Sequence, residues 1–284
     1  MEGLEKGKLY ICPTPIGNLE DITLRVLRVL KEVDAIAAED TRHSIKLLRH
    51  FDIQKPLISY HEHNEQTKSE YLIDRLLNGD SIALVSDAGM PGISDPGEIL
   101  IKRCIEGGID IEVLPGATAG ILALVASGLD TRRFSFEGFL DRGKKGRRQR
   151  LEEIELEDRS LIFYEAPHRI HTTLKDMLEI LGNRKAVVAR ELTKKHEEFI
   201  RGNLEEIYEQ LQENPPKGEM VLICEGISQD TLLARKEKAF EDISIKQHII
   251  SFMESGISKK DAIKEVAKTR NIPKSQVYKE AIDL

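Results

Sequence analysis

Short apolar runs alternate with amphipathic segments through the first half of the chain. The runs stop at polar or glycine-rich loops, as buried strands do, whereas the longer segments repeat their apolar residues with the period of a helix. We predict strands over residues 8–12, 35–38, 56–59, 82–85 and 109–114, and helices over residues 24–31, 44–50, 69–78, 98–106 and 121–127. Strands and helices that alternate in this way favour a mostly parallel sheet.

The second half follows a less regular pattern. We predict strands over residues 133–140, 160–164, 186–189, 198–201 and 220–224, and helices over residues 149–156, 170–181 and 204–213. Two of these strands follow each other without a helix between them, which favours a mixed sheet. The sequence therefore predicts an α/β protein of two lobes, with a parallel-type N-terminal sheet and a mixed C-terminal sheet.

A small helical extension is predicted at the C-terminal end. Helices over residues 245–254, 259–269 and 274–282 are separated by short turns, in the outline of a helix-turn-helix. Positive and negative charges nearly balance in this extension. Its charge is therefore compatible with two roles, contact with nucleic acid or purely structural packing. The expected domains are residues 1–128, 129–226 and 244–284, with a polar and charged linker over 227–243.

The composition argues against a disulfide-rich, zinc-binding, secreted or membrane protein. Its three cysteines lie far apart without a Cys-x-x-Cys pair, which argues against both a disulfide framework and a zinc site. No apolar run approaches the length of about 20 residues that a membrane span requires, and residues 1–8 lack the apolar stretch of a signal peptide. We expect a cytoplasmic protein without a membrane partner.

The charge pattern allows local but not general binding of nucleic acid. A net charge of −7 argues against a protein that coats nucleic acid non-specifically. Residues 142–150, however, contain no acidic residue, and their two glycines favour a mobile loop, which is either simply solvated or in contact with RNA phosphates. The candidate RNA-binding residues are Arg142, Lys144, Lys145, Arg147, Arg148 and Arg150.

The stretch from Ser81 to Gly97 is the strongest candidate for a ligand site. Its apolar first half predicts a buried strand, and three glycines and two prolines then force a turning backbone that carries Asp87 and Asp95. Open α/β sheets bind ligands in loops at the carboxyl ends of strands. An ordinary strand-to-helix connection is the alternative interpretation.

Several common site motifs are absent. The chain has no Gly-x-Gly-x-x-Gly after its first strand, no P-loop, no Gly-x-Ser-x-Gly and no His-Glu-x-x-His. His61 and His63 without further ligands are weak evidence for a metal, so no metal site is expected.

Six motifs stand out in order along the chain, at residues 13–19, 38–42, 86–97, 114–119, 164–169 and 190–194. Taken together, they resemble the tetrapyrrole-methylase superfamily and, within it, the ribosomal RNA small subunit methyltransferase I branch. The resemblance implies two α/β lobes with S-adenosylmethionine in the cleft between them, usually in a homodimer. It also implies 2'-O-methylation of a cytidine ribose in the decoding region of 16S rRNA, on free rRNA or on the small ribosomal subunit.

The resemblance also implies cofactor contacts, which we carry over by position. They are Pro15, Asp87, Met90, Ser94, Asp95, Thr118, Ala119, Phe163 or Tyr164, and Leu192. Where small-molecule relatives carry Gly-Asp-Pro in the central loop, this chain has Ser86, Asp87 and Ala88 followed by a longer glycine- and proline-rich insert.

Methyl transfer to a ribose hydroxyl needs alignment and a proton acceptor. Alignment of the reacting atoms can supply about 7–11 kcal/mol, and a base or a nearby charge helps because the 2'-hydroxyl is a weak acid. The polar loops offer Glu39, Asp40, His61, Glu165, His168 and Glu191 as bases, and Arg42, Arg169 and Lys194 to hold phosphate or stabilise charge. The sequence does not select one base.

Two other functions fit the sequence less completely. Methylation of a small tetrapyrrole precursor would use the same cleft but leaves the basic segment and the extension without a role. A ligand-sensing regulator would use the extension to bind DNA.

Overall fold

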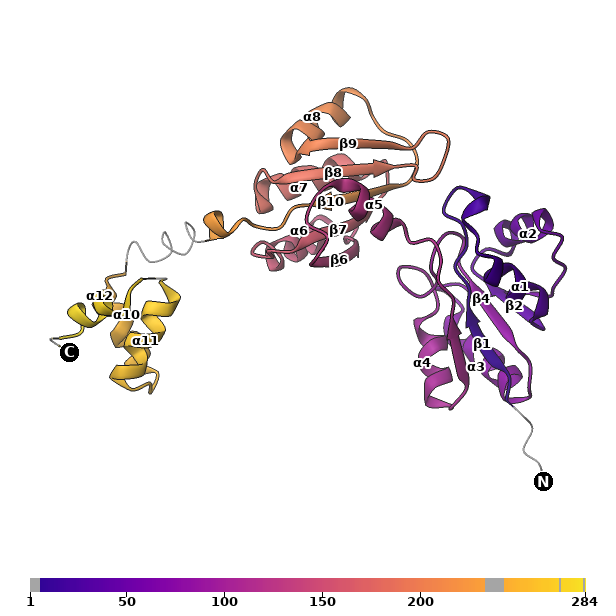
Figure 1. Ribbon diagram of the computed structural model, residues 1–284, viewed down its shortest axis with the longest axis horizontal. Coiled ribbons are helices and arrows are strands. Elements are labelled where there is room, and N and C mark those ends of the chain that lie inside the picture. Colours follow the sequence, from indigo (N-terminus) through magenta and orange to yellow (C-terminus); the bar gives the residue numbers. More distant parts are fainter. Residues whose placement is uncertain (1–5, 233–242, 271, 283) are drawn as a thin grey trace. The chain divides into compact units, whose positions relative to one another are not determined.

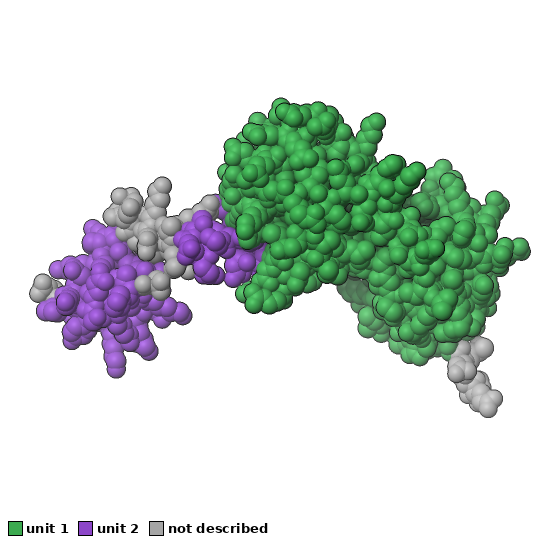
Figure 2. Space-filling model, turned by 45° about the horizontal axis from the view of Figure 1, so that its top comes forward, with its two compact units in different colours: residues 1–151, 160–225 green, residues 152–159, 226–284 purple. Residues whose placement is uncertain are grey.

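The computed structural model describes residues 6–232, 243–270, 272–282 and 284, in two compact units (Figure 2). The first unit comprises residues 1–151 and 160–225, and the second comprises residues 152–159 and 226–284. Most of the predicted linker 227–243 lies outside the described residues.

A five-stranded parallel sheet forms the first lobe, in the order β3-β2-β4-β1-β5. In chain order, the elements are β1 (Lys8–Ile11), the 3-10 helix η1 (Leu19–Asp21), α1 (Leu24–Glu32), β2 (Ala35–Ala38), α2 (Thr41–His50), β3 (Leu57–Ser59), α3 (Glu65–Leu77), β4 (Ile82–Val85), α4 (Glu98–Glu106), β5 (Asp110–Val113) and α5 (Ala119–Ser127). The predicted parallel sheet is confirmed.

Helices cover both faces of this sheet (Figure 1). On one face, α1 and α2 bury residues such as Leu30 and Leu48 against Ile36, and on the other, α3 and α4 bury Leu72 and Leu100. The neighbouring strands β1 and β4 lead to helices on opposite faces, so a crevice forms at their carboxyl ends.

The second lobe contains the predicted mixed sheet, in the order β6-β7-β10-β8-β9. Its elements are β6 (Phe134–Phe139), α6 (Lys144–Glu153), β7 (Ser160–Glu165), α7 (Ile170–Leu181), β8 (Lys185–Arg190), β9 (Glu198–Asn203), α8 (Leu204–Glu213) and β10 (Met220–Cys224). Only β6 and β7 are parallel; the other three pairs are antiparallel. Helix α5 packs Leu124 against Ile162 and Ile223 on one face of the sheet.

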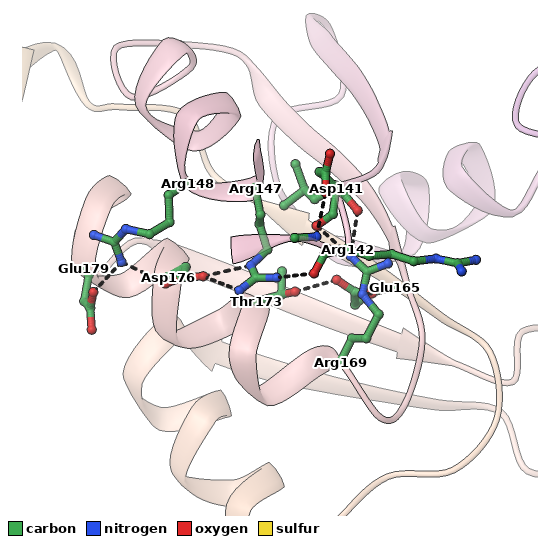
Figure 3. A network of polar contacts seen from close by, with 11 residues as sticks. Asp141, Arg142, Arg147, Arg148, Glu165, Arg169, Thr173, Asp176 and Glu179 are labelled. Atoms are coloured by element: carbon green, nitrogen blue, oxygen red, sulfur yellow. Dashed lines mark hydrogen bonds and ion pairs between the residues drawn. The ribbon is translucent and has the colours of Figure 1, made fainter. Parts of the chain in front are cut away.

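The expectation of a mobile basic loop was wrong, because residues 144–153 form helix α6 rather than a loop followed by a helix at 149–156. The carboxylate of Asp141 accepts a hydrogen bond from the backbone N–H of Gly143 at 2.6 Å, just ahead of the helix. Arg147 and Arg148 are then held by Asp176 on α7 (Figure 3). The glycines that suggested mobility therefore lie in an ordered segment.

The C-terminal extension consists of α10 (Ile245–Glu254), α11 (Lys259–Thr269) and α12 (Lys274–Glu280). Serine side chains cap the first two helices: Ser244 in a capping box with Gln247, and Ser258 by accepting from Asp261 N–H. Ile249, Val266 and other apolar residues of the three helices form a core of their own. The predicted helical extension is confirmed.

All three cysteines are free and buried. Burial raises the pKa of Cys12 to about 12, that of Cys104 to about 11 and that of Cys224 to about 12. Among the described residues, no helix is both long and apolar enough to cross a bilayer.

Candidate active site

A cavity of about 600 Å³ opens in the first unit and is lined by both sheets. Its volume lies within the range of small-molecule sites. The first lobe contributes Glu39 after β2, residues 87–90 and 93–95 after β4, and residues 118 and 119 at the start of α5. The second lobe contributes residues 164–167 at the end of β7 and just after it, and residues 218–221 at the start of β10. Around the end of β8 it contributes Ala189, Glu191, Leu192 and Lys194.

The central loop is fixed by backbone contacts. Gly89 and Thr14 exchange two backbone hydrogen bonds of 2.9 and 3.0 Å, which joins this loop to the loop after β1. Gly89 has φ +83°, a conformation that side-chain-bearing residues rarely adopt, so glycine is required there. On the other side, Glu65 on α3 accepts a hydrogen bond from Gly97 N–H at 2.9 Å.

Three carboxylates, Glu39, Asp87 and Asp95, give the cavity a negative wall. Burial, together with the charges of Glu39 and Asp87, raises the pKa of Asp95 to about 6. Burial and Asp87 likewise raise the pKa of Glu39. No ion pair to these three carboxylates occurs within the described residues, so a cationic ligand would relieve their repulsion.

Aromatic side chains form part of the opposite wall. The hydroxyl of Tyr164 accepts a hydrogen bond from Gly120 N–H at 3.2 Å, which links β7 to the start of α5. Phe139 lies edge-on to Tyr164 with ring centroids 5.5 Å apart and is 57% exposed, so an apolar ring is available to a ligand.

The loop after β8 is held in an uncommon conformation. Glu191 and Thr193 have φ of +52° and +65°, although neither is a glycine. Glu191 accepts hydrogen bonds from Lys194 and from Glu219 N–H, both at 3.0 Å. Gly17 lies so close to this loop that a Cβ there would be 2.4 Å from the Lys194 side chain. The loop after β8 therefore packs closely against Gly17 of the first lobe.

Glu165 is a structural carboxylate. It is buried, and it accepts hydrogen bonds from the Thr173 hydroxyl and from Ala166 N–H. It also forms an ion pair with Arg169 at 3.2 Å (Figure 3). Arg169 also donates to the backbone carbonyl of Leu140. These contacts fix the turn between β7 and α7 and engage both carboxylate oxygens of Glu165.

Several predicted site residues line the cavity and others do not. Those that line it are Glu39, Asp87, Met90, Ser94, Asp95, Thr118, Ala119, Tyr164, Glu165, Glu191, Leu192 and Lys194. Of the predicted pair Phe163 and Tyr164, Tyr164 lines the cavity, whereas Phe163 is fully buried and does not. The structure does not bring Arg42, Asp40, His61, His168 or Arg169 into the lining.

Pro15 lines a second cavity that adjoins the first. Sequence reasoning missed further residues of the first cavity, most of them apolar or small, together with Glu219. These are Ile16, Ala88, Gly89, Ile93, Phe139, Ala166, Pro167, Ala189, and residues 218–221. Strand-end position is the signal that could have found most of them. Within the described residues, no cluster of three or more histidine, cysteine or carboxylate groups is placed to hold a metal ion.

The sequence matches the family described as Tetrapyrrole (Corrin/Porphyrin) Methylases over residues 8–208. A protein of Halalkalibacterium halodurans named ribosomal RNA small subunit methyltransferase I is 53% identical over 274 residues, which cover 96% of this chain and 94% of the relative. The Bacillus subtilis protein of the same name is 47% identical with the same coverage.

Solved structures share the fold at low identity. A cobalt precorrin-4 methyltransferase covers 77% of this chain and 94% of its own at a TM-score of 0.59 and 16% identity. A diphthine synthase covers 78% of this chain and 90% of its own at a TM-score of 0.62 and 15% identity. With its two-sheet cavity and its extensive identity to these relatives, the chain belongs to the tetrapyrrole methylase superfamily and, within it, to the ribosomal RNA small subunit methyltransferase I branch.

Proposed function

We propose that this protein is an S-adenosylmethionine-dependent methyltransferase that modifies the ribose 2'-hydroxyl of a cytidine in the decoding region of 16S rRNA. The names of its relatives favour ribosomal RNA over a small tetrapyrrole as the substrate. The observation that carries the proposal is the negative wall of the cavity, where Glu39, Asp87 and Asp95 lie together and take part in no ion pair among the described residues.

The residues of the cavity fit this cofactor. S-adenosylmethionine, when bound, supplies a methyl group on a positively charged sulfonium. Burial and the neighbouring carboxylates raise the pKa values of Glu39 and Asp95, and a sulfonium or an ammonium group beside them would lower these pKa values. We assign the cofactor contacts to Asp87, Met90, Ser94, Asp95, Thr118, Ala119, Tyr164 and Leu192.

Glu39 is the best placed proton acceptor. It lines the cavity, it takes part in no ion pair in the described part of the chain, and burial together with Asp87 raises its pKa. The competing carboxylates are engaged: Asp40 caps α2 and pairs with Arg42, which lowers the pKa of Asp40 to about 2, and Lys194 lowers the pKa of Glu191. A base with a raised pKa accepts a hydroxyl proton more readily.

A Glu39→Gln substitution tests the catalytic assignment. We expect the wild-type rate to rise with pH as the carboxylate cluster loses its protons. In Glu39→Gln we expect kcat to fall about 10²–10⁴-fold and this rise to shift or vanish. The measurement is incorporation of labelled methyl groups into small-subunit rRNA over a range of pH, followed by mass mapping of the methylated ribose. A fully active Glu39→Gln enzyme would remove Glu39 as the base, and methyl groups on bases only would refute the ribose assignment.

Helix α6 offers a cationic face for the RNA backbone. Lys144 and Lys145 are exposed and have no carboxylate partner among the described residues, and the Arg142 side chain is also exposed. Arg147 is buried and Arg148 and Arg150 are ion-paired, so we assign phosphate contact mainly to the first three. Substituting Lys144 and Lys145 by alanine should weaken RNA binding and flatten its salt dependence.

We also propose a homodimer through α5 and the edge strand β6. Ile121, Leu122 and Val125 on α5 and Phe134 and Phe136 on β6 are exposed, and such an apolar surface beside an unpaired strand edge suits a self-complementary contact. Val125→Lys should convert the dimer to a monomer in sedimentation analysis. A wild-type protein that sediments as a monomer at micromolar concentration would refute the proposal.

A further inference from the structure

A second cavity, with a volume of about 350 Å³, adjoins the first. The two cavities share five lining residues, which are Ile16, Asp87, Ala88, Lys194 and Glu219. The remaining wall comes from the loop after β1 and from helix α2. A molecule in the second cavity would therefore lie directly beside a molecule in the first.

The two cavities differ in charge. Helix α2 contributes His43, Lys46 and His50, at positions i, i+3 and i+7 on one helical face. All three are exposed, and none has an ion-pair partner among the residues that the structure describes. The carboxylates among the lining residues, Asp87 and Glu219, belong to the shared wall. Basic side chains thus line the side away from the first cavity.

Apolar side chains complete the second cavity. Leu19 and Leu47 line it together with Pro15, and Leu19 is 40% exposed. Flat apolar surface of this kind can pack against a nucleobase, while basic side chains on the rim hold a phosphate group. Its volume, at the lower end of the range for ligand sites, suits one nucleotide better than a macrocycle.

We propose that this second cavity holds the acceptor nucleotide of the RNA. His43, Lys46 and His50 bind the flanking phosphates, Leu19 and Leu47 contact the base, and the ribose edge faces the shared wall at Asp87 and Ala88. This inference rests on the proposed function, because it places the substrate of that same reaction. It assigns to α2 a role in RNA recognition that is separate from that of α6.

Alanine substitutions of Lys46 and His50 in the full-length protein test the inference. Arg49→Ala is the matched control, since Arg49 is an exposed cation on the same helix that does not line the cavity. We expect the KM for small-subunit RNA to rise at least about tenfold in Lys46→Ala with a smaller change in kcat, and Lys46→Arg to restore most of the affinity. For single-stranded RNA, each lost phosphate contact should reduce the slope of log K against log salt by about 0.7.

Calorimetry with S-adenosylmethionine separates this inference from the proposed function. Unchanged cofactor affinity in Lys46→Ala, combined with weaker RNA binding, supports a distinct acceptor site. Equal RNA affinity and salt slope in Lys46→Ala and Arg49→Ala would overturn the inference while leaving the proposed function intact. A wild-type protein that binds no S-adenosylmethionine would instead refute the proposed function.

Discussion

The surroundings of Asp95 disfavour the ionised form of its carboxyl group. Its pKa is raised from 3.8 to about 6 by burial and by its neighbours Glu39 and Asp87. The folded protein therefore retains a proton that the unfolded chain loses between these two values, so ionised Asp95 destabilises the ligand-free fold above about pH 6 and no longer does so below pH 3.8. The same negative charge that lowers the stability of the ligand-free protein can strengthen the binding of a cationic ligand.

We predict that Asp95→Asn raises the melting temperature of the ligand-free protein at pH 7.5 and has little effect near pH 4. The same substitution should weaken S-adenosylmethionine binding at pH 7.5, because one negative charge of the cavity is removed. Differential scanning calorimetry and titration calorimetry provide the two measurements. Asp74→Asn, at an exposed position on α3, is the control, and a stability gain of the same size at both pH values would contradict the electrostatic explanation.

At the scale of elements, helix α6 is attached to α7 by a buried ion pair. Arg147 donates to Asp176 from Nη2 at 2.7 Å and from Nε at 2.8 Å, and both side chains are about 5% exposed. Arg148 contacts the second oxygen of Asp176 and also Glu179 (Figure 3). Removal of Arg147 would leave the buried Asp176 carboxylate with the partly exposed Arg148 alone, so much of the cost of burying that charge would no longer be offset.

We predict that Arg147→Ala lowers the free energy of unfolding by about 3–5 kcal/mol, whereas Lys144→Ala changes it by less than about 0.5 kcal/mol. Joint replacement of Arg147 by Met and Asp176 by Leu should recover most of the loss, because no unpaired charge remains. Denaturant titrations of the single and joint variants measure this difference. A joint variant no more stable than Arg147→Ala would show that the unpaired buried charge is not the main cause of the lost free energy of unfolding.

The sequence predicted the elements that have a clear hydrophobic period and missed those determined by distant contacts. The parallel sheet followed from apolar runs such as residues 82–85, and the mixed sheet from strands that follow each other closely. The first half of helix α6, residues 144–148, was predicted as a loop because Arg147 and Asp176 are 29 positions apart, so a local reading sees mainly glycines and cations there. For the same reason, the sequence could not show that Glu165 is engaged by Thr173.

The candidate site was predictable where residues lie at strand ends. Asp87 and Asp95 lie in the loop between β4 and α4, and both line the cavity. The base could not be selected from sequence, because Glu39 and Asp40 are adjacent and differ only in their folded surroundings, one near Asp87 and the other bound to Arg42. The walls of the second cavity depend on which face α2 presents, which also requires the fold.

At the scale of the whole molecule, the C-terminal unit carries a row of lysines. Lys260, Lys264 and Lys268 are exposed at intervals of four residues on α11, and none has an ion-pair partner within the described chain. Like charges at this spacing destabilise a helix by about 0.2–0.5 kcal/mol per pair. The row therefore favours contact with a polyanion over simple packing.

We predict that joint alanine substitution of Lys260, Lys264 and Lys268 leaves thermal stability equal or slightly higher but reduces affinity for small-subunit RNA, most strongly at low salt. Fluorescence anisotropy at several salt concentrations measures the effect. Joint substitution of Lys31 and Lys102, which are exposed on α1 and α4, provides the control. RNA affinity that matches this control would indicate that the unit serves packing alone.

The three buried thiols can be used to detect local opening of the protein. Cys12 and Cys104 belong to the packed layers on opposite faces of the first sheet, and Cys224 belongs to β10 of the second. Because only the thiolate reacts with alkylating reagents, each cysteine stays unlabelled until its own layer opens. The order in which iodoacetamide modifies these three positions in mild denaturant, read by peptide mass, would thus reveal which lobe loosens first and whether a bound ligand delays it.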